Sequence, residues 1–109
     1  MIYPLLMKNY ACHRLYDSPD HYSGQSVVTL DECGQVVSYA PLTNELPATE
    51  WIGGVILLSD KQELVHTDTL TNQFRQLLSG VSPRKYAWHI SAFDFRQEEP
   101  ISGCIIRRL

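Results

Sequence analysis

The sequence predicts an α+β domain: a mainly antiparallel sheet of about five or six strands with one helix, near residues 68–78, packed on one face. Strand-like segments precede and follow a single helical segment, and they do not alternate with helices as βαβ units would. A glycine turn also joins two segments rich in β-branched residues. No repeat or linker interrupts the 109 residues, so we expect one domain over residues 1–109.

The glycine turn lies in the first half of the chain. Residues 27–30 and 36–40 have the composition of strands and flank Asp31 and Gly34, which supply turn chemistry. A loosely alternating segment from Tyr10 to Leu15 precedes them. We therefore expect a first strand followed by a β-hairpin.

A continuous apolar run from Val55 to Leu58 predicts a strand that is buried on both faces. Gly53 and Gly54 come just before it and lack the spacing and the following lysine of a phosphate-binding loop. We expect these glycines to allow a bulge or the close approach of another backbone segment.

One amphipathic helix is indicated by an apolar stripe at helical spacing, formed by Leu70, Phe74, Leu77 and Leu78. Asp68 is the expected N-cap, and Gly80 is the expected stop after the last turn. Residues 63–66, just before the helix, fit either a short strand or a loop. The chain then returns to strand from Tyr86 to Phe95, and Cys104 to Arg107 should form a closing strand that pairs with it.

Composition and charge narrow the class of function. The formal net charge of -3 leaves no basic surplus for a phosphate backbone, so we expect no nucleic-acid partner. The three cysteines are widely spaced and form no Cys-x-x-Cys pair, which predicts neither a disulfide framework nor a zinc ribbon and fits a reducing cytoplasm. The apolar start, residues 1–7, contains Pro4 and is too short for a signal peptide or a membrane span. Met7 also looks like a natural start.

Histidines are the main candidates for chemistry. His89, with Asp94 five residues on, could join His13 or His66 across the sheet as a metal-binding or acid–base group. No His-x-His or His-Glu-x-x-His spacing occurs, and Cys12 and His13 should point to opposite faces of a strand. We therefore expect no metal or other cofactor, and histidines on half-buried strands as the simpler interpretation.

No nucleophile has the sequence context that activation requires. Ser102 lacks the Gly-x-Ser-x-Gly pattern of a nucleophile elbow. Cys104 lies in an apolar segment, where burial raises rather than lowers a thiol pKa, so we interpret it as a small core residue.

The hairpin over Thr29 to Val37, a proline-bearing connection, and the run from Gly53 to Leu57 together resemble the small β-domain at the start of amidohydrolase-type enzymes. In that family the corresponding strand leads into a catalytic barrel. The metal-binding His-x-His pair that the family has soon after this strand is absent, since residues 59–66 contain one histidine. A barrel of about 250 residues also exceeds this chain. The resemblance implies a sheet topology without the enzyme.

Two functions remain open. The first is a non-enzymatic β-rich domain that associates with itself or with another protein. The second is a small-ligand or metal-assisted hydrolase-like enzyme that uses His89 with His13 or His66. Convergence of two histidines and a carboxylate in one pocket would favour the enzyme.

Self-association is the more specific expectation, as a symmetric dimer through sheet edges or the aromatic-rich strand near the C-terminus. Both faces of that strand are apolar, and one helix can cover only one face of a sheet. The expected interface residues are Trp88, Phe93 and Phe95. The alternative is that residues 1–6 and the loop around Trp51 cover the second face.

Overall fold

The computed structural model describes residues 7–43 and 48–109, in which it forms eleven strands and one helix. The elements are β1 (Lys8–Cys12), β2 (Arg14–Ser18), β3 (His21–Ser23), β4 (Ser26–Leu30), β5 (Val36–Pro41), β6 (Thr49–Trp51), β7 (Val55–Ser59), α1 (Leu70–Leu78), β8 (Tyr86–Ile90), β9 (Phe93–Asp94), β10 (Glu99–Pro100) and β11 (Ile106–Arg108). Within these ranges, no helix has the length and apolarity needed to cross a membrane.

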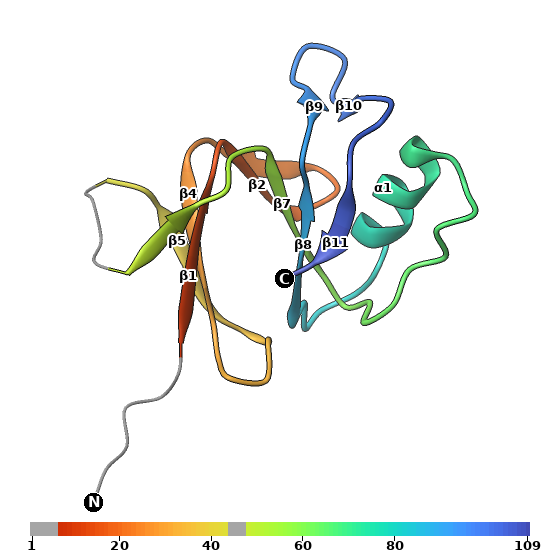
Figure 1. Ribbon diagram of the computed structural model, residues 1–109. Coiled ribbons are helices and arrows are strands. Elements are labelled where there is room, and N and C mark those ends of the chain that lie inside the picture. Colours follow the sequence, from red (N-terminus) through yellow and green to blue (C-terminus); the bar gives the residue numbers. More distant parts are fainter. Residues whose placement is uncertain (1–6, 44–47) are drawn as a thin grey trace, which may run out of the picture.

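The strands form two main sheets, and the helix lies outside them as a third layer (Figure 1). One sheet has the order β5-β4-β1-β6 and the other the order β11-β8-β7-β2-β3, while β9 and β10 form a small hairpin. Most pairs are antiparallel, but β1 pairs with β6 and β2 with β7 in parallel. The predicted α+β class with a single helix is confirmed, but the strands are divided between two sheets instead of forming one.

The sheets are separate because three long strand segments bend from one sheet into the other. The bends lie at His13, between β1 and β2; at residues 24–25, between β3 and β4; and at residues 52–54, between β6 and β7. At the far side, a bridge between Gln35 and Tyr86 brings the start of β5 against β8. The two sheets therefore pack against each other around one part of the core. The predicted first strand is divided between β1 and β2.

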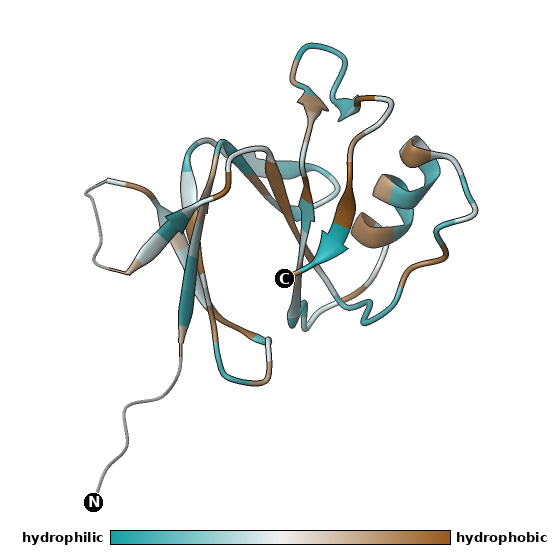
Figure 2. Cartoon of the chain, viewed as in Figure 1, coloured by the Kyte–Doolittle hydropathy of each residue, from teal (hydrophilic) through white to brown (hydrophobic). Residues whose placement is uncertain are grey.

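Two clusters of buried side chains result. The inner one lies between the sheets and consists of Cys12, Leu15, Val28, Leu30, Ile56, Leu58 and Ala87. The outer one lies under the helix and consists of Tyr16, Val55, Leu57, Phe74, Leu77, Leu78, Trp88, Ile90, Phe93 and Ile106. Strands β7 and β8 contribute alternate residues to both clusters, and Figure 2 shows the strongly hydrophobic character of β7. The prediction that residues 55–58 are buried on both faces is confirmed.

The β4–β5 hairpin has the turn chemistry that the sequence indicates. The Oδ1 atom of Asp31 accepts hydrogen bonds from the backbone N–H groups of Cys33, at 2.9 Å, and Gln35, at 3.0 Å. Gly34 has a φ of 80°, a left-handed conformation that glycine adopts without steric cost. The predicted hairpin is confirmed.

The N-cap of helix α1 lies one residue later in the chain than the sequence predicted. Thr69 is the N-cap, and its side chain accepts from the Asn72 N–H at 3.2 Å. Asp68 was the expected N-cap, and it instead accepts from the Thr69 N–H and from the Asn72 side chain. After the helix, the guanidinium of Arg84 donates to the carbonyl oxygens of Leu58, Leu78 and Gly80, which ties the helix end to β7.

The C-terminal strands are shorter than predicted. The expected strand from Tyr86 to Phe95 is β8 up to Ile90, followed by a turn and the short β9. Strand β11 pairs antiparallel with β8, with Ile106 opposite Ile90, which confirms the predicted terminal pair. Residues 63–66 form a loop. Residues 1–6, the alternative to a dimer as cover for the second sheet face, lie outside the described ranges.

Candidate interaction surface

Two of the candidate histidines meet at the Gly53–Gly54 turn, where β6 bends into β7. His13 is held by two hydrogen bonds of 3.0 Å, because its N–H donates to the Gly54 oxygen and its Nδ1 accepts from the Gly54 N–H. His89 approaches from the other side, and its Nε2 donates to the Gly53 oxygen at 3.1 Å. The ring nitrogens that face the turn are therefore used in holding the bend.

Glycine is required at this turn for two reasons. Gly53 and Gly54 have φ angles of 64° and 60°, a region that residues with a side chain rarely adopt. A Cβ at Gly54 would also overlap the backbone oxygen of Ile90, and one at Gly53 would lie 3.2 Å from Cε1 of His13. The expected close approach of backbone segments at these glycines is confirmed.

The other candidates lie elsewhere. Asp94 accepts from the backbone N–H groups of Arg96 and Gln97 and so shapes the β9–β10 turn. His66 is exposed in the loop before α1, beside a depression of about 410 Å³ that Trp88 and Arg107 also line. No group of three or more histidine, cysteine or acidic side chains is placed to hold a metal ion in the part of the chain that the structure describes.

Two of the three expected interface residues are core residues. Trp88 is 3% exposed and donates from Nε1 to the Lys61 oxygen, while Phe93, 5% exposed, packs against Tyr16 and Phe74. The placement of Trp88 and Phe93 at a dimer interface is thus corrected, because the helix covers one face of their sheet and the four-stranded sheet covers the other. Phe95 is at the surface.

Phe95 belongs to a row of exposed rings that crosses the bend between the sheets. We name this row the aromatic strip, and it consists in spatial order of Tyr22, Arg14, Phe95, His13 and Trp51. The Arg14 guanidinium lies 3.9 Å from the ring centre of Tyr22 and 4.9 Å from that of Phe95. The His13 ring then lies 6.1 Å from Phe95 and 4.8 Å from Trp51, centre to centre. Each side chain in the strip therefore packs against the next one.

The cation in the strip is held in a largely buried position. The Arg14 side chain is 15% exposed, and its guanidinium donates to the Tyr16 hydroxyl at 3.3 Å. Glu98 of the β9–β10 turn is 3.7 Å away, an ion pair without a hydrogen bond. Stacking between two rings favours a guanidinium both as a cation and as a flat group.

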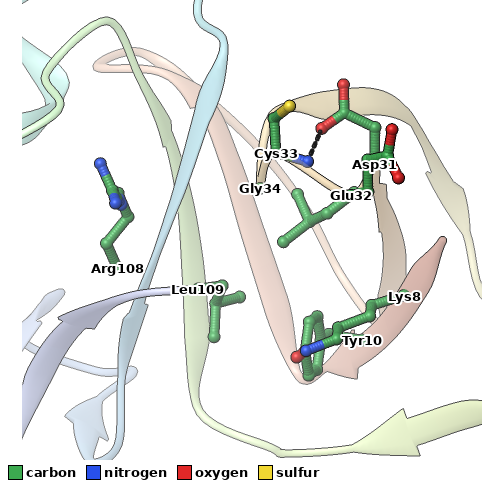
Figure 3. Close-up of a pocket in the computed structure, with 9 residues that line it drawn as sticks. Lys8, Tyr10, Asp31, Glu32, Cys33, Gly34, Arg108 and Leu109 are labelled. Carbon is green, nitrogen blue, oxygen red and sulfur yellow. Dashed lines mark hydrogen bonds between the residues drawn. The ribbon is translucent and has the colours of Figure 1, made fainter. Parts of the chain in front are cut away.

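A pocket of about 410 Å³ lies apart from the strip, between β1, the β4–β5 turn and the end of β11 (Figure 3). Its lining residues are Lys8, Tyr10, Leu30, Asp31, Glu32, Cys33, Gly34, Arg108 and Leu109. Figure 3 shows the Arg108 side chain standing apart from the other labelled side chains. The sequence-predicted candidates are all outside this lining, and Asp31 is committed to the turn.

The strip was not predicted as a unit. Its members come from residues 13 to 95 and share no motif, so spacing along the chain gives no signal for them. The only indication available was the chemistry of each residue, because tyrosine, tryptophan, phenylalanine and arginine are enriched in interfaces.

His89 should make stability depend on pH. Burial lowers the pKa of His89, the Arg107 charge lowers it further, and the hydrogen bond to Gly53 opposes both effects. Below about pH 6.5, His89 is protonated in the unfolded chain, whereas in the folded protein its lowered pKa keeps it neutral down to a lower pH. The stability present above that pH is therefore lost as the pH falls toward the lower folded pKa.

Urea unfolding at pH 7.5 and pH 5 measures this effect. His89→Gln should show a smaller loss of unfolding free energy on acidification than the wild-type protein. His66→Gln, in an exposed loop, is the control and should keep the wild-type loss. An unchanged loss in His89→Gln would contradict the assignment.

Comparison of the chain with models of protein families, with curated proteins and with solved structures gave no match.

Proposed function

We propose that this protein is a non-enzymatic association domain that binds a protein surface through the aromatic strip. The observation that carries the proposal is the unbroken row of exposed rings around one largely buried cation. Tyr22, Trp51 and Phe95 are 43%, 47% and 39% exposed, although their apolar rings would lose water favourably in a contact.

The composition of the strip matches the energetic centres of interfaces. Tryptophan, tyrosine and arginine are the residues that most often dominate binding energy when a partner buries them. Rings have few rotatable bonds, and those of the strip are further restrained by their neighbours. Little conformational entropy would therefore be lost on binding.

Three of the remaining reactive groups, His13, His89 and Cys12, serve the fold. His13 and His89 are hydrogen-bonded to the backbone of the Gly53–Gly54 turn. Burial raises the pKa of the Cys12 thiol to about 11, which disfavours a thiolate nucleophile. Cys12, Cys33 and Cys104 are free thiols, which supports a reducing cytoplasm as the site of action. These features support association over catalysis.

A combined variant tests the proposal. Replacing Tyr22, Trp51 and Phe95 with serine should weaken association at least about tenfold, because these rings supply the apolar contact. The matched control replaces Val37, Val65 and Val81, which are 51%, 62% and 72% exposed outside the strip, with serine. Circular dichroism should show that both variants fold.

Association is measured in two ways: by light scattering coupled to size exclusion, and by quantitative capture of bound proteins from an extract of the native cells. Wild type and control should give the same complex, and the strip variant should lose it. A strip variant that associates like wild type, or a wild type that forms no complex in either assay, would refute the proposal.

A further inference from the structure

The aromatic strip carries an anion next to its cation. Glu98 lies beside Arg14, with 3.7 Å between the carboxylate Oε1 and the guanidinium nitrogen. The Glu98 side chain is 54% exposed, whereas that of Arg14 is 15% exposed. Within the chain this contact is thus long, has no hydrogen bond, and leaves the carboxylate open to another molecule.

The backbone holds Glu98 in this place by an unusual conformation. Its φ is 56°, in the left-handed region that glycine and asparagine adopt more readily than glutamate. The β9–β10 turn that contains Glu98 is fixed by the hydrogen bonds of Asp94 to Arg96 and Gln97. A glutamate kept at such a position, beside exposed rings, indicates a role for its carboxylate at the surface.

We propose that the partner of the aromatic strip is a second copy of this chain, in a symmetric dimer whose subunits exchange the Arg14–Glu98 pair. Arg14 of one subunit binds the partner's Glu98, and Glu98 binds the partner's Arg14. This inference rests on the proposed function and names its occupant.

Charge complementarity favours a second copy over an unrelated protein. A surface with only a cation would repel its own copy, but a two-fold axis between Arg14 and Glu98 places opposite charges together twice. The same axis brings Phe95 and Tyr22, which flank the guanidinium, into the centre of the contact. Rings that exclude water there would strengthen both exchanged pairs.

Charge reversal of each partner gives a test that depends on the exchange. Arg14→Glu and Glu98→Arg should each weaken the dimer at least about tenfold, because each homodimer would then contain two contacts between like charges. An equimolar mixture of the two variants should restore a heterodimer, since both of its contacts join opposite charges. Arg96→Glu and Glu99→Arg, on exposed residues of the same hairpin, are the controls and should dimerise like wild type.

Sedimentation equilibrium of each protein and of the mixture gives the dissociation constants, and circular dichroism with thermal unfolding checks that each protein folds. If Arg14→Glu does not fold, Arg14→Gln takes its place without the mixing test, because glutamine carries no charge, and Arg14→Gln and Glu98→Arg must then each weaken the dimer. Recovery of the dimer in the mixture supports the exchange.

Three results would overturn the inference. They are a wild type that stays monomeric at high micromolar concentration, single variants that dimerise like wild type, and a mixture that does not recover. The same experiments distinguish failure of the dimer from failure of the proposed association role. A monomeric wild type that captures a different cellular protein, and loses it in the serine variant of the strip, would keep the association role and reject the second copy.

Discussion

Replacing Gly54 with alanine is expected to destabilise the protein by about 3 kcal/mol or more. The alanine would need a left-handed backbone, with φ near 60°, and its Cβ would overlap the Ile90 oxygen. The overlapped atom belongs to the backbone at the end of β8, where Ile90 is paired with β7 and β11, so it cannot rotate away as a side chain could. The bend that joins the sheets would have to open.

Gly24 provides the matched control for this prediction. It lies at another of the bends between the sheets, but an added Cβ there meets no atom within 4 Å. Gly24→Ala should change the unfolding free energy by no more than about 1 kcal/mol. Urea denaturation followed by circular dichroism measures both variants, and equal stabilities for the two would contradict the described role of Gly54.

Trp88→Ala is expected to cost about 3–5 kcal/mol, because the indole is an almost completely buried part of the outer core and its removal leaves a cavity. The variant also leaves the Lys61 oxygen without the indole N–H that now donates to it. At the exposed Trp51, the same substitution should cost no more than about 1 kcal/mol.

The two tryptophans therefore separate the core from the binding surface. Trp88→Ala should lower the thermal midpoint strongly, and Trp51→Ala should reduce association while the protein stays folded. A large loss of stability in Trp51→Ala with a small one in Trp88→Ala would contradict this division. Differential scanning calorimetry gives both midpoints.

The parts of the fold that the sequence predicted are those with a strong local pattern. The β4–β5 hairpin follows from Asp31 and Gly34 between β-branched segments, and α1 follows from an apolar stripe at helical spacing. The buried strand β7 follows from a continuous apolar run. In each case the residues that decide the structure are close together in the chain.

The division into two sheets could not be predicted in the same way. Strand composition continues through His13, so the sequence gives no sign that β1 ends and β2 begins there. The bend depends on two hydrogen bonds between His13 and Gly54, one donated by the backbone N–H of each residue, and these residues are far apart in the chain. One sheet with an uncovered face was the wrong inference that followed, and it led to Trp88 and Phe93 as interface residues.

The candidate site was predicted in part. Phe95 was named from its aromatic neighbourhood, but Arg14, Tyr22 and Trp51 join it only through the bend. His13 and His89 do come together, as a support for the glycine turn. The resemblance to the small β-domain of amidohydrolase-type enzymes stays a prediction.

Site-specific photo-crosslinking in the native cells tests the association role most directly. A photoreactive phenylalanine analogue is placed at Phe95 or Tyr22 in the strip, and at Val81 or Ile105, which are 72% and 63% exposed elsewhere. The proposed role predicts a discrete adduct, with a second copy or another protein, from Phe95 and Tyr22 and none from Val81 and Ile105. Adducts only from Val81 or Ile105, or none from the strip positions, would contradict it.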